Sequence, residues 1–220
     1  MSGARRILAI TALVIAGESV FLLPFVLQRV FRPTLLEVFD LTNLELGTAF
    51  AVYGVVAMAA YFFGGPLADR FPARNLLAIA LASTAAGGLV MMTVPSHSTL
   101  VLLYAYWGFT TMALLWAPMI RATREWGGET EQGRAFGLLD GGRGLLAATM
   151  GSVMVLLFAG FLPEDASTAN ITEKTEALRR VILAMSGITL AAAVLVMLAL
   201  PYSDPSDGGS HQPLSMEGVR

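Results

Sequence analysis

The segment from residue 46 to residue 94 is the clearest indication of the kind of fold. It reads LGTAFAVYGVVAMAAYFFG over 46–64, GPLADRFPARN over 65–75 and LLAIALASTAAGGLVMMTV over 76–94. The two outer segments have 19 residues each and contain no charged side chain. A helix needs about 20 apolar residues, at about 1.5 Å each, to cross a hydrocarbon core of roughly 30 Å. The stretch therefore predicts two membrane-crossing helices joined by a short polar segment.

Four other apolar segments of similar length lie before and after this stretch. They are Ile7–Leu27, Thr99–Ile120, Ala135–Leu162 and Val181–Leu200. A cleaved secretion signal is the alternative for the first, but that segment is longer than the usual apolar region of a signal and contains Glu18. We predict an all-α integral membrane protein with six transmembrane helices in residues 1–200. Residues 201–220 are rich in Pro, Gly, Ser and Asp and predict a flexible cytoplasmic tail or linker.

The composition excludes several other classes of protein. Of the 220 residues, 55% are hydrophobic and 14% are charged, whereas a soluble domain carries about 25% charged residues. The net charge of −2 offers no basic surface, so nucleic acid is not an expected partner. There is no cysteine, and the two histidines, His97 and His211, lie far apart. We therefore expect no metal site, no cofactor and no enzyme.

Charged side chains within the predicted spans mark the candidate site. There are three such side chains: Glu18, Asp140 and Arg143. Such residues cost about 2.5–3.5 kcal/mol at a helix centre and face the bundle interior or a watery cavity. Asp140 and Arg143 are three residues apart and can pair, either as a structural ion pair or as a site where Arg143 binds an anionic substrate.

Glu18 has no partner within its own predicted helix. It is either a protonatable coupling site or cation contact, or an acid paired elsewhere in the bundle. Thr11 lies seven residues earlier on the same helical face and could line the same cavity. On the fourth predicted helix Tyr104, Trp107 and Thr111 share one face and are candidates to line that cavity, although aromatic residues near span ends are often interface anchors.

The polar segment between the second and third predicted helices carries a motif. It resembles the signature Gly-x-Leu-Ala-Asp-Arg-x-Gly-Arg-Arg/Lys-x-x-Leu of the major facilitator superfamily. The matching positions are Gly65, Leu67, Ala68, Asp69, Arg70, Arg74 and Leu77, whereas Pro72 and Ala73 depart from the pattern. The resemblance implies a conformational latch in which Asp69 caps a helix N-terminus and the arginines are its charge partners. The alternative is a positively charged loop with one acid.

The fifth predicted helix carries a second, weaker resemblance. The run Gln132–Gly137 is similar to the start of helix 5 in many members of that family. Small residues follow at spacings of four and three, at Gly137, Gly141, Gly144, Ala148 and Gly151. Such a stripe allows another helix backbone to approach closely.

The resemblance implies one six-helix repeat of a transporter that has two. In that fold the substrate binds between the repeats near the midplane. We expect secondary-active symport or antiport of a small solute, an organic anion or a sugar-like molecule. The chain would then be a natural half, a fragment or a degenerate relative. The expected partners are membrane lipid, the solute and a second six-helix half, as a homodimer or a separate chain. The alternative is a membrane partner protein that keeps the fold but does not transport.

Orientation follows from the distribution of Lys and Arg over the short loops. With the N-terminus inside, the cytoplasmic side holds Arg5, Arg6, Arg70, Arg74, Arg121, Arg124, Arg134 and Arg220, and the other side holds Arg29, Arg32, Lys174, Arg179 and Arg180. We expect an integral protein of a bacterial inner (plasma) membrane with both termini in the cytoplasm.

The topology can be tested directly because the chain has no native cysteine. We predict that Ser210→Cys is not labelled by an impermeant thiol reagent added to intact cells, and is labelled once the membrane is permeabilised. Labelling in intact cells would contradict the cytoplasmic C-terminus.

Overall fold

The computed structural model describes residues 3–163 and 169–202, and in these ranges every regular element is a helix. Six helical segments are long and apolar enough to cross a membrane, as predicted. They are Gly3–Val30, Asn43–Arg70, Ala73–Met91, His97–Gly127, Gln132–Ala159 and Ile171–Ala199. Most of the predicted tail, from Ser203 onward, lies outside the described residues.

Two of the six spans consist of several elements. The first contains α1 (Gly3–Ser19), the π-helical segment η1 (Leu22–Val26) and α2 (Leu27–Val30), and a short helix α3 (Arg32–Val38) follows it. The fourth contains α6 (His97–Phe109), the π-helical segment η2 (Thr110–Trp116) and α7 (Ala117–Gly127). The other spans are the single helices α4 (Asn43–Arg70), α5 (Ala73–Met91), α8 (Gln132–Ala159) and α9 (Ile171–Ala199).

Local sequence explains where several of these helices begin. Thr42 and Glu45 form a capping box at the start of α4, and Asn170 and Glu173 form another at the start of α9. Each box satisfies backbone amides that have no partner within the helix. The change to η1 occurs around Pro24, which lacks the amide hydrogen that a regular α-helix needs at this position.

The polar segment 65–75 differs from its prediction as a loop. Helix α4 continues through it to Arg70, with Pro66 inside the helix, and only Phe71 and Pro72 are non-helical before α5 begins. The residue before a proline favours an extended conformation, and Phe71 has ψ of 147°. Arg121 on α7 donates a hydrogen bond to the Ala68 carbonyl at 2.7 Å and so satisfies one of the last carbonyls of α4.

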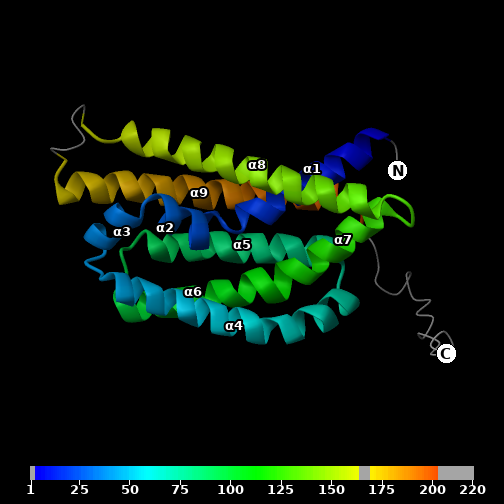
Figure 1. The fold of residues 1–220 in the computed structure, drawn as a ribbon, viewed down its shortest axis with the longest axis horizontal. Coiled ribbons are helices and arrows are strands. Elements are labelled where there is room, and N and C mark those ends of the chain that lie inside the picture. The colour runs from blue at the N-terminus through cyan, green and yellow to red at the C-terminus, as the bar shows by residue number, and fades with distance from the viewer. Residues whose placement is uncertain (1–2, 164–168, 203–220) are drawn as a thin grey trace.

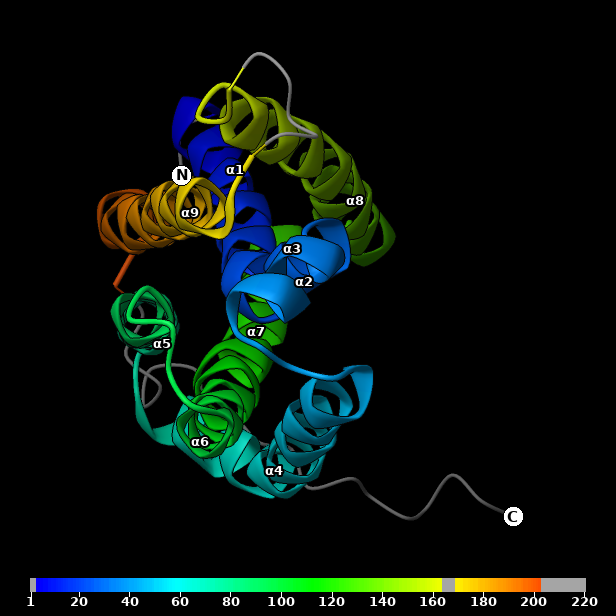
Figure 2. The same ribbon diagram turned by 90° about the vertical axis from the view of Figure 1, so that its left-hand side faces the viewer.

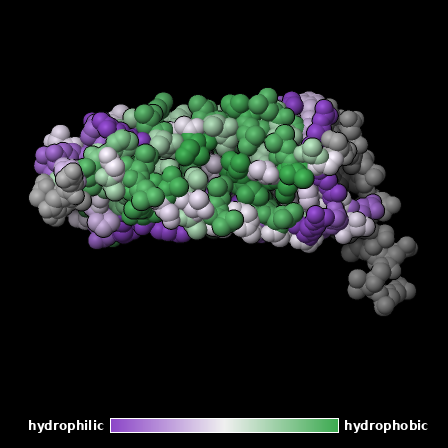
Figure 3. Space-filling view, turned by 90° about the horizontal axis from the view of Figure 1, so that it is seen from above, coloured by the Kyte–Doolittle hydropathy of each residue, from purple (hydrophilic) through white to green (hydrophobic). Residues whose placement is uncertain are grey.

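The helices run side by side along the long axis of the bundle (Figure 1). In the end-on view α1 packs against α8 and α9, α5 against α9, and α4 against α6 (Figure 2). The face seen in Figure 3 is hydrophobic in its middle and hydrophilic at both ends. This distribution fits a bundle whose middle is surrounded by lipid.

Burial is uneven among the spans. In the most apolar 18-residue window of each, 72% of the first span is buried but only 28% of α4 and 6% of α8. The end-on view places α8 and α4 at the two outer ends of one side of the bundle, with α2 and α3 between them (Figure 2). These two helices therefore leave most of their surface uncovered by the rest of the chain.

Glycine allows the closest contact between α4 and α6. A Cβ atom added at Gly108 would lie 2.6 Å from the Tyr53 carbonyl oxygen. Tyr104 and Trp107, on the same helix, are fully buried beside this contact. The close packing of the backbones thus brings the largest side chains of α6 into the core.

We predict that Gly108→Ala destabilises the bundle, because the added methyl group meets backbone atoms that cannot rotate away. Overpacking costs about 1–3 kcal/mol, which corresponds to a fall of about 2–12 °C in the apparent Tm for a chain of this size. Gly54→Ala on α4 is the matched control, since nothing lies within 4 Å of its added Cβ. Thermal unfolding in detergent would contradict the packing if both variants melted like the wild type.

Candidate functional site

A cavity of about 750 Å³ opens between the first span, α4, η2 and α8. Its charged lining residues are Glu18, Arg29 and Arg143. The remaining lining is aromatic or small and apolar: Phe21, Phe25, Val26, Val30, Tyr61, Met112, Trp116, Ala147, Ala148 and Gly151. The cavity therefore combines an apolar wall with a few charged groups, which is typical of small-molecule sites.

Arg143 is the centre of the polar contacts in this cavity. Its Nε donates to the Gly17 carbonyl at 3.2 Å and lies 4.0 Å from Glu18 Oε2, and its Nη1 donates to Asp140 Oδ1 at 3.4 Å. Gly17 makes the approach possible, because an added Cβ would lie 2.9 Å from Arg143 Cδ. The arginine of α8 thus binds across the backbone of α1.

The end of α1 provides the acceptor for Arg143. In a continued α-helix the Phe21 amide would reach Gly17 O, but it donates instead to Glu18 O at 2.9 Å. The Gly17 carbonyl therefore lacks its regular α-helical donor and accepts from the Arg143 side chain instead. The α-helix is interrupted between Ser19 and Pro24, and this interruption makes the Gly17 carbonyl available as a hydrogen-bond acceptor within the membrane-crossing region.

Arg143 retains unused binding capacity. A guanidinium has five N–H donors, and charge-assisted hydrogen bonds are typically 2.7–2.9 Å long, shorter than the contacts of Arg143. Its guanidinium carbon lies 5.7 Å from the ring centre of Phe21 and 5.6 Å from that of Trp116. The side chain is held in place by aromatic rings and long polar contacts, and acceptors among the described residues use only two of its donors.

The three charged residues of the predicted spans meet as one group. Arg143 pairs with Asp140 as the spacing predicted, and Glu18 finds its nearest cation, Arg143, on another helix. Glu18 is buried, with 8% of its surface exposed, whereas the Asp140 side chain is 69% exposed and does not line the cavity.

The aromatic face of the fourth span does not line the cavity. Tyr104, Trp107 and Thr111 are fully buried in the core. Trp107 Nε1 donates to the Thr84 carbonyl at 3.1 Å, and Thr111 Oγ1 bonds the Tyr53 hydroxyl at 2.7 Å. They are core residues because their face packs on α4 and α5. Thr11 is exposed and is also absent from the cavity lining.

Several residues that line the cavity were not predicted from the sequence, above all Arg29, Tyr61 and Trp116. The cavity-lining face of the first span could have been recognised from the sequence. Its residues follow one another at spacings of three, four and four, at Glu18, Phe21, Phe25 and Arg29. That spacing puts them on one helical face.

The latch motif lies at the ends of two helices. Gly65, Asp69 and Arg70 belong to the last turns of α4, and Asp69 and Arg70 are exposed there. A cap needs a helix N-terminus, but the N-cap of the next helix, α5, is Pro72. Among the described residues no hydrogen bond or ion pair joins Asp69 to Arg70 or Arg74. The predicted latch is thus not formed within this part of the chain.

The small-residue stripe of α8 is largely open. Nothing lies within 4 Å of a Cβ added at Gly137, Gly141 or Gly144, and at Gly151 only Val30 does, at 3.8 Å. The close contact of α8 with α1 occurs one position away, at Gly142, where an added Cβ would lie 2.9 Å from Val14. In the described residues the stripe therefore has no neighbouring helix along most of its length.

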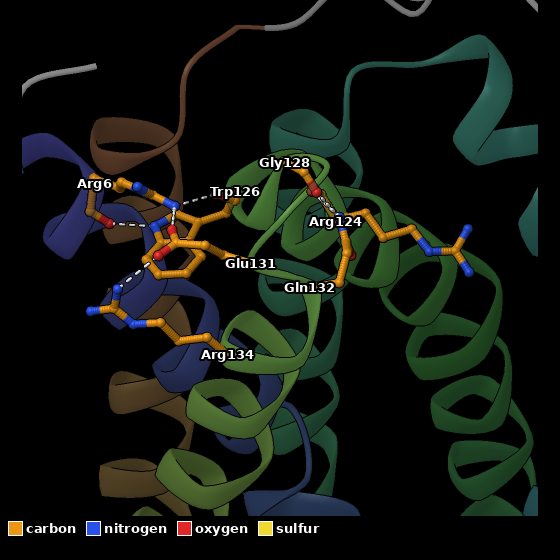
Figure 4. Close-up of polar contacts among 7 residues, drawn as sticks. All are labelled: Arg6, Arg124, Trp126, Gly128, Glu131, Gln132 and Arg134. Carbon is orange, nitrogen blue, oxygen red and sulfur yellow. Dashed lines mark hydrogen bonds and ion pairs between the residues drawn. The ribbon is translucent and has the colours of Figure 1, made fainter.

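A polar cluster, the Glu131 clasp, joins α1 to the segment between α7 and α8 (Figure 4). It consists of Arg6, Trp126, Glu131 and Arg134. Glu131 accepts hydrogen bonds from Arg6 and, at 2.9 Å, from Arg134. Trp126 Nε1 donates to the Arg6 carbonyl at 2.6 Å, and the Arg6 guanidinium lies 4.5 Å from the Trp126 ring centre. The clasp holds the start of α1 beside the start of α8, the two helices that meet again at Arg143.

Comparison with known proteins agrees with this architecture. The family profile described as Major Facilitator Superfamily matches residues 5–214. Two relatives from Escherichia coli K12 are the inner membrane proteins YqcE, 26% identical over 74% of this chain, and YihN, 26% identical over 68%. The aligned regions cover 38% and 35% of those two proteins, so the chain matches little more than a third of their length. No solved structure matches the chain significantly.

We predict that the Glu131 clasp weakens in acid. Hydrogen bonds from Arg6 and then Arg134 are the main causes that hold the pKa of Glu131 below its ordinary value of 4.5. A carboxyl group whose pKa is lowered on folding stabilises the folded state above its unfolded pKa, and this contribution is lost as pH falls through the folded value. Glu131→Gln should lower the apparent Tm at pH 7, and its difference from wild type should shrink below pH 4.5.

Glu125→Gln is the control, because among the described residues Glu125 pairs within α7, with Arg121, and joins no second span. The prediction fails if Glu131→Gln melts like the wild type at pH 7, or if its effect does not differ between pH 7 and pH 4.

Proposed function

Because the chain belongs to the major facilitator superfamily, we propose that its bundle is one repeat of a secondary-active transporter for a small organic anion. The observation that supports this best is the cavity beside α1 and α8, which is lined by two arginines and one glutamate. The excess of positive charge favours an anionic solute over a neutral sugar. Tyr61 and Trp116 offer ring surfaces for the organic part of the solute.

Glu18 and the solute would compete for Arg143 in this proposal. The glutamate lies 4.0 Å from the guanidinium, which leaves room for a carboxylate or phosphate of the solute to replace it. Proton uptake by Glu18 would remove its attraction for Arg143 and favour binding of the anion. Loss of the proton would restore the internal pair and release the solute. This exchange would couple proton movement to anion movement.

We also propose a second six-helix half that covers α4 and α8. Asp140 is 69% exposed on α8, and a charged residue in a span is costly unless it faces a polar partner or water. The open stripe at Gly137, Gly141 and Gly144 lies on the same helix and would let a partner helix approach closely. The partner is either a second copy of this chain or another six-helix segment, and the greater length of the relatives supports such an arrangement.

The printed names of the relatives support a bacterial inner membrane as the location. The first and last described residues lie at the same end of the bundle, as an even number of spans requires (Figure 1). This end carries Arg5, Arg6, Arg70, Arg74, Arg121, Arg124 and Arg134. The positive-inside rule then assigns it to the cytoplasm.

Transport into proteoliposomes tests the proposed roles. The full chain is reconstituted, and uptake of labelled carboxylates and sugar phosphates is measured with and without an inward proton gradient. We predict that Arg143→Gln abolishes uptake of the anions that the wild type accepts. Glu18→Gln should retain exchange of solute across the membrane but lose gradient-driven accumulation. Arg124→Gln removes the same charge from the exposed end of the bundle and should transport like the wild type.

Three outcomes would contradict different parts of the proposal. Full gradient-driven uptake by Glu18→Gln would exclude it as the coupling residue. Transport by a chain that light scattering shows to be monomeric would exclude the second half. A chain that inserts and associates normally but moves none of the anions or neutral sugars would favour the alternative, a membrane partner protein that keeps the fold without transporting.

A further inference from the structure

The outer surface of the bundle has a second cavity, separate from the one at Arg143. It is a groove of about 580 Å³ between α5 and α9. The large side chains of its wall are exposed and apolar, Asn75 is its one polar lining residue, and its floor contains the buried small residues Ala78 and Ala193. The full lining is Asn75, Ala78, Ile79, Ala82, Leu190, Ala193, Val194, Met197 and Leu198.

The groove begins at one end of the bundle, the end that we assign to the cytoplasmic head-group region. Asn75 is near the first residue of α5 and Leu198 near the last residue of α9, at the same end of the bundle. From Asn75 to Ala82 the groove follows α5 for seven residues, about 10 Å at 1.5 Å per residue. It therefore covers the outer third of a hydrocarbon core of roughly 30 Å, where the first part of an acyl chain would lie.

A cationic side chain lies at the mouth of this groove. Arg74 directly precedes Asn75, and its guanidinium carbon lies 5.3 Å from the ring centre of Tyr202, just beyond the end of α9. The Arg74 Nε atom is buried and has no hydrogen-bond acceptor in the part of the chain that the structure describes. None of the ion pairs between described residues involves Arg74.

We propose that this groove binds one acyl chain of an anionic phospholipid whose phosphate contacts Arg74. The apolar lining matches the chain, and the arginine at the mouth matches the charge of the head group. Basic sites between transmembrane helices on the cytoplasmic side are known to bind such head groups. The site is independent of the proposed transport function, because it lies on the outer surface and shares no lining residue with the Arg143 cavity.

Native mass spectrometry of the delipidated full chain in detergent tests this site. Phosphatidylglycerol and phosphatidylcholine with identical acyl chains are titrated separately. We expect one phosphatidylglycerol to bind about fivefold more tightly than phosphatidylcholine, the ratio typical of one arginine near an anionic surface. Arg74→Gln should remove this preference, whereas Arg124→Gln, at the same end of the bundle, should keep it.

A second pair of variants tests the groove itself. Ala82→Leu fills the groove and should weaken binding of both lipids, whereas Ala59→Leu places the same side chain at an exposed position of α4 and should not. The proposal would be overturned if Arg74→Gln and Arg124→Gln lost the preference for phosphatidylglycerol equally. It would also be overturned if Ala82→Leu bound both lipids as the wild type does.

A competition experiment tests the contribution of the acyl chain. Displacement of the lipid by millimolar glycerol phosphate would overturn the proposal, because the acyl chain would then contribute nothing. If deletion of the residues after Tyr202 is needed before any lipid binds, that segment is the occupant instead.

Discussion

The structure depends on the cost of placing Arg143 inside a helix that crosses a membrane. A guanidinium carries five N–H donors, and facing hydrocarbon costs it several kcal/mol. It must therefore find acceptors and opposite charge. The Gly17 carbonyl of α1 and Asp140 of its own helix accept its hydrogen bonds, and the Glu18 carboxylate of α1 lies 4.0 Å away as an ion-pair partner. This requirement brings two spans that are far apart in the sequence to the same side of one cavity.

Two details of α1 make the contact possible. Gly17 has no side chain to block the arginine, and the change to η1 leaves its carbonyl without the usual backbone donor. At the exposed end of the bundle the Glu131 clasp holds the same two helices together. Around α4 and α6 the core is held together by close backbone packing and not by a buried charge. There Gly108 lets α6 lie directly against α4. One side of the bundle is therefore closely packed and the other encloses a charged cavity.

The sequence was sufficient to predict the six spans, because hydrophobic length alone determines which segments cross a membrane. It also predicted the contact between Asp140 and Arg143, which needs only helical spacing. It could not predict that Tyr104, Trp107 and Thr111 face the core, because a helix that is apolar all round gives no signal for its inner face. The end of α4 was missed for another reason: Pro66 and the charges of Asp69 and Arg70 resemble a loop, yet Arg121 stabilises the last turn from a different span.

In the transporter that we propose, the cavity around Arg143 contains water and provides the solute pathway. The most direct measurement is the rate at which single cysteines on α8 react with a small water-soluble thiol reagent in membranes. Ala147 lines the cavity, whereas Leu156 is 72% exposed on the outside of the same helix. We predict that Ala147→Cys reacts and that Leu156→Cys, which lies away from the cavity among apolar surroundings, does not. Equal reactivity of the two, or an inert cysteine at position 147, would contradict it.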